Sequence, residues 1–193
     1  RIVRMDVDTT SRKGMHEKII ESFGNHEYDI LLGTQMIAKG LDFPKVTLVG
    51  VINADSSLNI PDFRSAENTF QLLSQVSGRA GRGELNGEVI IQSYNPEHYS
   101  INYAKRHDYI NFYKEEMKIR KTLSYSPYYY LTIVNISSQD YEIGFKEANK
   151  IGEYLRKKLG SDTKVLGPSM ANIFKINKVY HYQCIIKYKR DDK

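Results

Sequence analysis

Two arginines set between glycines are the residues of this chain whose side chains could most directly do chemistry. Arg79 and Arg82 stand three residues apart in the run QVSGRAGRG, residues 75–83, directly after an apolar helical pattern. A positioned guanidinium stabilises the charge that builds up on a transferring γ-phosphoryl group, and such an arginine finger contributes about 10³ to 10⁵ in rate. The alternative is an ordinary helix C-terminus, where cations offset the dipole and glycine supplies a left-handed cap. This segment alone leaves both interpretations open.

A second segment, GTQMIAKGLDFP at residues 33–44, precedes the arginines. It follows an apolar run at residues 28–32 that predicts a short strand, and ligands of open α/β sheets bind at the carboxyl ends of strands. There the backbone amide of Gly33 and the hydroxyl of Thr34 can hold a phosphate. Asp42 places a carboxylate within reach of a ribose hydroxyl or an arginine. The alternative is a strand-to-helix loop, but the order and spacing of the two segments favour a ligand site.

The elements that must position these residues alternate between strand and helix. This alternation predicts the α/β class, with a parallel sheet covered by helices. The continuous apolar run at residues 46–52 predicts a central strand buried on both faces. We expect Thr10 or Ser11 to cap the first helix and Ser65 to cap the next one. Strands are predicted at residues 1–7, 28–32, 46–52 and 88–93, and a loop at residues 55–64.

The second half of the chain has a different pattern. Asn95-Pro96 predicts a boundary, because the residue before a proline is biased away from helix. Two connector helices are then expected, followed by a β-α-β-β order that predicts a small ferredoxin-like α+β domain. The predicted elements are helices at roughly 97–106 and 108–122, a strand at 128–136, a helix at 141–159, a strand at 164–166, and a hairpin of 171–178 with 180–188. The expected domains are residues 1–96, 97–125 and 126–193.

Charge is distributed unevenly along the 193 residues, whose formal net charge is +5. Residues 1–96 carry 10 basic against 12 acidic side chains, a net charge of −2, whereas residues 97–193 carry 18 against 11, a net charge of +7. Of the 15 tyrosines, 13 lie in the second half. Cations and aromatic rings together suit single-stranded nucleic acid. Solubilising lysines on a tyrosine-rich domain explain the pattern equally well.

Several protein classes are disfavoured. We find no signal-peptide pattern and no apolar run approaching 18 residues, so a soluble, cytoplasmic chain without a membrane partner is expected. The single cysteine, Cys184, excludes an internal disulfide, and its strand pattern predicts a buried thiol. The five histidines show no ligand spacing, so no metal bound by this chain is predicted. The chain opens at Arg1 inside a strand pattern, which indicates a fragment.

The pair GTQMIAKGLDFP and QVSGRAGRG resembles motifs V and VI of superfamily-two helicases. The run RMDVDTT at residues 4–10 resembles the motif IV region. The runs NAD, NIPDFRSAE and TFQLL between residues 53 and 73, with the tail from residue 167 to 187, resemble the primosomal protein N-prime (PriA) family of replication-restart helicases. This resemblance covers essentially the whole chain. It implies a C-terminal fragment that holds the second RecA-like motor lobe, with motifs IV to VI, and a C-terminal domain.

The resemblance also implies roles for single residues. The motif VI residues would act on the γ-phosphate. In motif V, the first residues would contact nucleic acid and the later ones would couple to the nucleotide. These groups are Arg79, Arg82 and Gln75 as catalytic residues, Asp42 and Gly40 as nucleotide-binding residues, and Gly33, Thr34, Gln35 and Lys39 as nucleic-acid contacts. A solvated loop explains Gln35 and Lys39 equally well. Loop caps and ion pairs explain Asp55, Asp62 and Arg64 as well as any functional role.

By resemblance, the parent protein is an ATP-dependent 3′–5′ DNA helicase that restarts stalled replication forks and promotes primosome assembly. The implied partners are single-stranded and forked DNA, single-strand-binding protein and primosome proteins. The chain contains no G-x-x-x-x-G-K-[ST] and no acidic pair after a strand for Mg²⁺. ATP and Mg²⁺ would therefore bind mainly to another lobe, and the fragment alone is expected to hydrolyse no ATP. By resemblance, zinc would be bound elsewhere in the parent protein. The alternatives are another superfamily-two translocase, or a non-catalytic module that binds single-stranded DNA or protein through residues 97–193.

Overall fold

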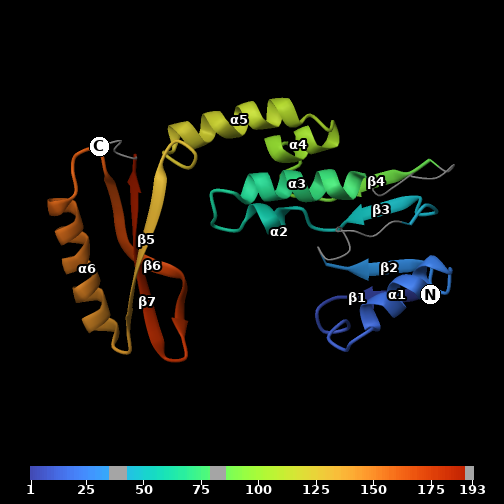
Figure 1. The fold of residues 1–193 in the computed structure, drawn as a ribbon, viewed down its shortest axis with the longest axis horizontal. Helices are drawn as coiled ribbons and strands as arrows, with labels where there is room; N and C mark the ends of the chain where they lie inside the picture. Colours follow the sequence, from blue (N-terminus) through green and yellow to red (C-terminus); the bar gives the residue numbers. More distant parts are fainter. Residues whose placement is uncertain (35–42, 79–85, 190–193) are drawn as a thin grey trace. The chain divides into compact units, whose positions relative to one another are not determined.

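The computed structural model of the chain describes residues 1–34, 43–78 and 86–189. The chain divides into two compact units, Arg1–Tyr113 and Lys114–Lys193, which are described separately below. The boundary falls inside helix α5 (Tyr109–Thr122). Figure 1 shows the order of the elements along the chain. Among the described residues, none of the helices combines the length and the apolar character needed to cross a membrane.

The strands of the first unit form two parallel pairs. Strand β1 (Ile2–Met5) pairs with β2 (Ile30–Gly33), and β3 (Leu48–Val51) pairs with β4 (Glu88–Ile91). Parallel strands separated by helices confirm the predicted α/β class. The single parallel sheet that the sequence predicts is seen, over the described residues, as these two separate pairs.

Helices pack against each strand pair and form two apolar cores. Helix α1 (Met15–Gly24) contacts β1, and Ile19 is buried beside Met5 with Phe43 packed against them. The other helices of the unit are α2 (Asp55–Leu58), α3 (Ser65–Ser77), α4 (Tyr99–Lys105) and the start of α5. Phe70 of α3 stacks on Phe112 of α5 with ring centroids 4.1 Å apart. Ile101 and Ala104 of α4 are buried in the same cluster as Phe70, so the helix that follows Asn95-Pro96 shares a core with residues that precede it.

Strand β3 is not buried on both faces, so that prediction is wrong. Its side chains alternate, and Leu48 keeps 57 % of its surface exposed whereas Val51 packs against the core of α3 and α4. Within residues 1–34, 43–78 and 86–189, apolar cover lies on one face of β3 only, and the strand pairs with one neighbour, β4. A continuous apolar run shows that a strand can be buried; it does not show that both faces are covered.

The expected helix caps are also wrong. Gly14, with a positive φ of 82°, precedes α1, and the hydroxyls of Thr10 and Ser11 donate instead to the carbonyls of Asp6 and Asp8. These short side chains stabilise the turn after β1, because local hydroxyl-to-backbone bonds compete with helix capping.

Helix α3 likewise begins without a side-chain cap. Arg64 precedes it, and Ser65 is its first helical residue. The Ser65 carbonyl accepts a hydrogen bond of 2.8 Å from the Thr69 hydroxyl. Ser65 therefore lies one position too far along the chain to serve as the cap. The serine nevertheless predicted the start of the helix to within one residue.

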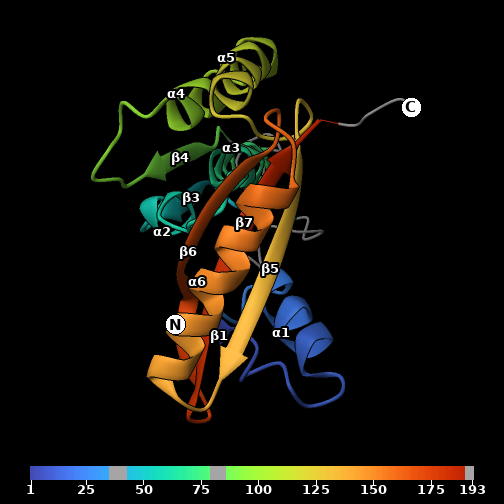
Figure 2. The ribbon, with the colours of Figure 1, turned by 90° about the vertical axis from the view of Figure 1, so that its left-hand side faces the viewer.

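The second unit is a three-stranded antiparallel sheet with a helix on one face (Figure 2). The chain order is β5 (Tyr130–Ser138), α6 (Tyr141–Lys158), β6 (Lys164–Ile176) and β7 (Val179–Tyr188), and β7 is the central strand. The predicted strand at 164–166 and first hairpin strand at 171–178 are one strand, β6, whose pairing with β7 shifts register twice. Helix α6 is capped by Asp140, whose Oδ1 accepts from the amide of Ile143 at 2.9 Å.

Candidate nucleotide and nucleic-acid sites

The carboxyl edge of the first strand pair carries the start of the motif V segment. Gly33 ends β2 opposite Met5, the last residue of β1, and Thr34 follows with an exposed side chain. Both residues therefore lie at the end of a parallel strand, as the sequence predicts. This is the edge at which open α/β sheets bind their ligands.

A rigid turn follows β1 at the same edge. Asp6 is buried; its Oδ1 accepts from the amide of Thr9 at 2.9 Å, and its carboxylate pairs with Arg4. The Thr9 hydroxyl in turn accepts from the Asp6 amide at 2.8 Å. The hydrogen bond from the Thr9 amide, with the Arg4 charge as a further cause, lowers the pKa of Asp6. The turn beside Gly33 and Thr34 thus carries a fixed carboxylate.

Helix α3 places Gln75 in its last turn, where the side chain is half-buried. The helix ends at Gly78, which has φ −78° and ψ 6° and donates its amide to Ser74 at 3.3 Å. Gly78 is therefore not the left-handed glycine that the alternative interpretation of this segment invokes. The remaining predicted site residues lie outside the described residues: Gln35, Lys39, Gly40 and Asp42 in motif V, and Arg79 and Arg82 in motif VI.

Asp55 ties the ends of β3 and β4 together, a role that sequence reasoning did not assign. The carboxylate is only 7 % exposed and accepts from the Ser93 hydroxyl and from the Tyr94 amide, each at 2.8 Å. The bond from the Tyr94 amide, reinforced by that from Ser93, lowers the pKa of Asp55. Asn53, which precedes the short helix α2, stabilises the turn into it, because its Oδ1 accepts from the amide of Asp55 at 3.1 Å.

A hollow of about 100 Å³ lies at this carboxyl edge. Its lining residues follow directly after β3 and β4: Ile52, Asn53, Asp55, Gln92, Ser93 and Tyr94. The sequence signal that could have found it is the appearance of polar side chains at the ends of two apolar strands, in the NAD run and in the SYN run at residues 93–95.

Asp62 and Arg64 organise the loop before α3. The Asp62 carboxylate accepts from the Arg64 amide at 2.8 Å, and the Arg64 guanidinium lies 3.3 Å from the other carboxylate oxygen. The guanidinium also lies over the Phe63 ring, 5.4 Å from its centroid. These contacts match the loop-cap and ion-pair interpretation of this stretch.

The second unit holds a group of lysines and tyrosines, here called the lysine–tyrosine cluster: Tyr125, Tyr129, Lys164, Lys187 and Lys189. Lys187 is only 6 % exposed; its Nζ donates to the Leu123 carbonyl at 2.9 Å and lies 3.6 Å from the Tyr125 ring centroid. Lys164 pairs across the sheet with Lys187, and its Nζ contacts the Ser124 hydroxyl at 2.9 Å. Lys164 and Lys189 both lie over the Tyr129 ring, at 5.8 and 5.4 Å.

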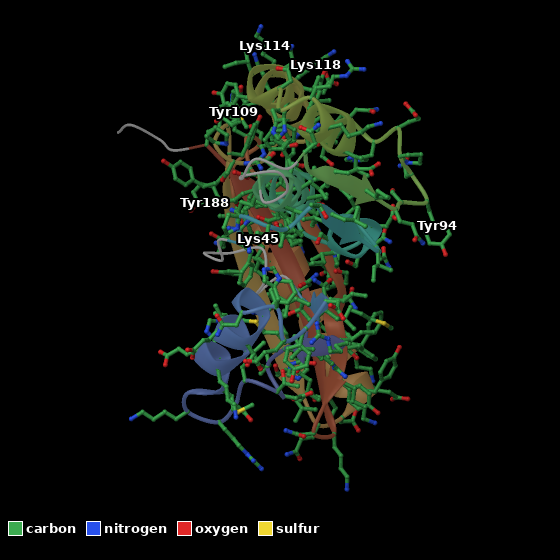
Figure 3. The ribbon with its side chains drawn as sticks, turned by 90° about the vertical axis from the view of Figure 1, so that its right-hand side faces the viewer. Lys45, Tyr94, Tyr109, Lys114, Lys118 and Tyr188 are labelled. Carbon is green, nitrogen blue, oxygen red and sulfur yellow. The ribbon has the colours of Figure 1, made fainter. Side chains whose placement is uncertain are left out.

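No carboxylate offsets the three ammonium groups of this cluster within the part of the chain that the structure describes. Tyr130 extends the aromatic surface, since it is exposed and its ring stacks on that of Tyr188 with centroids 5.7 Å apart; Figure 3 labels Tyr188. Lys187 acts as a clamp between β7 and the end of α5, whereas Lys164 and Lys189 keep exposed side chains. The cluster can therefore attract an anion and offer a ring surface together.

The single thiol is buried, and the described acidic, histidine and cysteine side chains form no metal-binding group. Cys184 is fully buried on β7, as predicted, and burial raises the pKa of its thiol. Over residues 1–34, 43–78 and 86–189, no three side chains of His, Cys, Asp or Glu are grouped closely enough to hold a metal ion.

Comparison with known families assigns both parts of the chain. Residues 2–84 match the Helicase conserved C-terminal domain, and residues 121–193 match the Primosomal protein N C-terminal domain. Over 191 residues, or 99 % of its length, the chain is 60 % identical to the Replication restart protein PriA of Bacillus subtilis, and it spans 24 % of that relative. The protein of the same name from Synechocystis is 44 % identical over 97 % of the chain, which spans 23 % of that relative.

The chain thus spans about a quarter of the length of the curated relatives that it matches. The two domain matches follow each other in the order that the motifs predict, and the identity extends through both compact units. The chain belongs to the PriA family of replication restart proteins.

Proposed function

We propose that this chain is the second motor lobe and C-terminal domain of an ATP-dependent 3′–5′ DNA helicase that restarts stalled replication forks and promotes primosome assembly. The observation that carries the proposal is the 60 % identity to a Replication restart protein PriA along nearly the whole chain, together with a helicase C-terminal domain over residues 2–84. The placement of Gly33 and Thr34 at the carboxyl end of β2 agrees with it. The proposed substrates are single-stranded and forked DNA. The protein would act in the cytoplasm, with single-strand-binding protein and primosome proteins as partners.

Within this proposal, each site residue keeps the role that the family motifs give it. Gly33, Thr34, Gln35 and Lys39 contact the DNA strand, Gly40 and Asp42 couple to the nucleotide, and Gln75 helps position Arg79 and Arg82. Bound ATP with Mg²⁺ supplies the free energy of hydrolysis, and another lobe, with the family's zinc region, completes the enzyme. This chain contributes guanidinium groups that stabilise charge on the phosphoryl group.

Two finer points of architecture belong to the same proposal. We divide the chain into a RecA-like lobe at residues 1–96, a connector at 97–125 and a C-terminal domain at 126–193. The β5-α6-β6-β7 order, with one helix on the antiparallel sheet, supports a ferredoxin-like description of the last domain.

The test compares ATP turnover in three samples. The isolated 193-residue chain should hydrolyse no ATP in a coupled-enzyme assay, because it lacks a phosphate-cradling loop. In the longer protein, Arg82→Ala should reduce DNA-stimulated turnover by about 10³-fold or more. Arg106→Ala, which removes an exposed arginine at the end of α4, is the matched control and should leave turnover unchanged. Unchanged turnover in Arg82→Ala, or turnover by the isolated chain, would contradict the assignment.

A second candidate function concerns the C-terminal unit, and the lysine–tyrosine cluster favours it. Exposed ammonium groups beside aromatic rings, with no carboxylate to offset them among the described residues, suit the phosphates and bases of single-stranded DNA. The unit would then act as a non-catalytic DNA-binding module within the helicase. A protein-docking role is the competing outcome.

A salt titration of oligo(dT) binding decides between these outcomes. Lys164→Ala and Lys189→Ala should each weaken binding and reduce the slope of log K against log salt by about 1. Lys146→Ala, an exposed lysine on α6, is the control and should change neither quantity. Unchanged slopes in both cluster variants would leave the protein-docking role as the better explanation.

A further inference from the structure

Tyr94 is the most exposed large hydrophobic side chain of the described residues, with 94 % of its surface open to solvent. Figure 3 shows this side chain projecting from the turn that follows β4. An aromatic ring exposed to this degree buries almost none of its apolar surface, so it stabilises the unit little. It is available to a partner.

The backbone beneath this ring is firmly held. The Tyr94 amide donates to Asp55, the Ser93 hydroxyl donates to the same carboxylate, and the Asn95 amide donates to the Ser93 hydroxyl at 3.0 Å. Asp55 is buried and begins helix α2, which places its carboxylate on a rigid element. Because this backbone is already held, Tyr94 loses little backbone entropy when its ring binds a partner, which favours its use as a contact.

The hollow that Asn53, Gln92 and Tyr94 help to line offers neutral polar groups to a small ligand. Its volume is about 100 Å³. Asn53 and Gln92 line it with exposed amides, and within the described residues no hydrogen bond engages the Asn53 Nδ2 or the Gln92 side chain. Such amides pair with the hydrogen-bonding edges of bases.

The charge of the hollow argues against a phosphate or an acidic peptide. The Asp55 carboxylate lines it, and residues 1–96 carry a net charge of −2. An anion would therefore be repelled, whereas an uncharged base could stack on the tyrosine and use the amides. The position of the hollow at the carboxyl edge of β3 and β4 is also where open α/β sheets take their ligands.

We propose that this hollow binds one unpaired nucleobase of single-stranded DNA, stacked on Tyr94 and held at its edge by Asn53 and Gln92. This site rests on the proposed helicase function and adds to it a base contact beyond motifs V and VI. It predicts that the first unit grips the strand partly by a base, and not by phosphates alone.

The absence of tryptophan from the 193 residues permits a direct test. In the Tyr94→Trp chain the single indole should be quenched by oligo(dT) in step with binding, and not by an abasic oligonucleotide with the same phosphates. Tyr94→Ala should weaken oligo(dT) binding by roughly 5-fold to 150-fold, the equivalent of about 1–3 kcal/mol for one stacked base. Tyr94→Phe, which keeps the ring, should bind as the unmodified chain does.

A second reporter serves as the matched control. Tyr154→Trp places the single indole on an exposed position of α6, and its emission should stay constant during the same titration. If the chain binds oligo(dT) while the indole emission of Tyr94→Trp and the affinity of Tyr94→Ala stay unchanged, the nucleobase site is overturned and the proposed function stands. If the unmodified chain binds no oligo(dT), the DNA-binding part of the proposed function fails, and the site fails with it.

Discussion

The ring of Tyr182 packs directly against Gly144, so closely that a Cβ on Gly144 would lie 2.7 Å from the Tyr182 Cε2. Tyr182 is 2 % exposed, and its hydroxyl donates to the Tyr141 carbonyl at 2.9 Å, so the ring is fixed at both ends. The same Cβ would also lie 2.9 Å from the Cβ of Ser138. The contact brings α6 close to β7, because only glycine leaves room for the ring.

Gly144→Ala should therefore lower the free energy of unfolding of the second unit. Overpacking a filled core costs about 1–3 kcal/mol. The better helix propensity of alanine offsets roughly 1 kcal/mol of that cost. Gly160→Ala is the matched control, since a Cβ there meets nothing within 4 Å. Urea unfolding followed by circular dichroism measures both, and a Gly144→Ala midpoint above that of the unmodified chain would contradict the packing.

The single thiol can report on the same unit. Cys184 is fully buried and its pKa is raised by burial, so little reactive thiolate forms at the surface. Ellman's reagent should react very slowly with the native chain, and the rate should rise with urea in step with unfolding of the sheet. Gly144→Ala should react faster than the unmodified chain at the same urea concentration. A native rate equal to that of a free cysteine would show that β7 is open to solvent.

Acid should destabilise the first unit through Asp6 and Asp55. Both have a pKa lowered in the folded state, so their stabilising effect is full above the unfolded value of about 3.9 and is lost as the pH falls through the folded value. Asp55→Asn should lower stability at neutral pH and weaken the acid dependence, because the amide cannot accept from both Ser93 and Tyr94. Asp8→Asn removes an exposed carboxylate and should change neither the stability at neutral pH nor its dependence on acid. Equal urea midpoints for Asp55→Asn and the unmodified chain between about pH 3 and 7 would contradict this account.

Lys187 should matter for stability more than for charge. Lys187→Met keeps the apolar stem but removes the hydrogen bond to the Leu123 carbonyl and the contact with Tyr125. Hydrogen bonds to charged groups contribute about 1.5–3 kcal/mol, so the unfolding free energy should fall by about that amount. Lys146→Met, an exposed lysine on α6, should be near neutral. Thermal unfolding of the two variants measures the difference. Because both lose one positive charge, a lower unfolding temperature in Lys187→Met alone is due to the lost contacts of Lys187.

The sequence by itself determined the parts of the fold that depend on local pattern. The helix at 141–158 lies within one residue of its predicted range, and the helix at 65–77 begins at the residue predicted to cap it, because apolar spacing and end signals act over a few neighbouring residues. The parallel α/β character of the first unit and the β-α-β-β order of the second also followed from the pattern. The site predictions at Gly33 and Thr34 depended on a strand end, which is itself a local feature.

Tertiary structure decided what depends on residues far apart in the chain. The Asp55 carboxylate meets Ser93 and Tyr94 only because β3 and β4 pair in parallel, and no local pattern encodes that meeting. The exposure of Leu48 and the lysine pair at 164 and 187 likewise depend on which faces are covered and which strands are neighbours. Burial and long-range hydrogen bonds are properties of the folded arrangement, so a one-dimensional pattern can state which residues are able to make them but not which residues do.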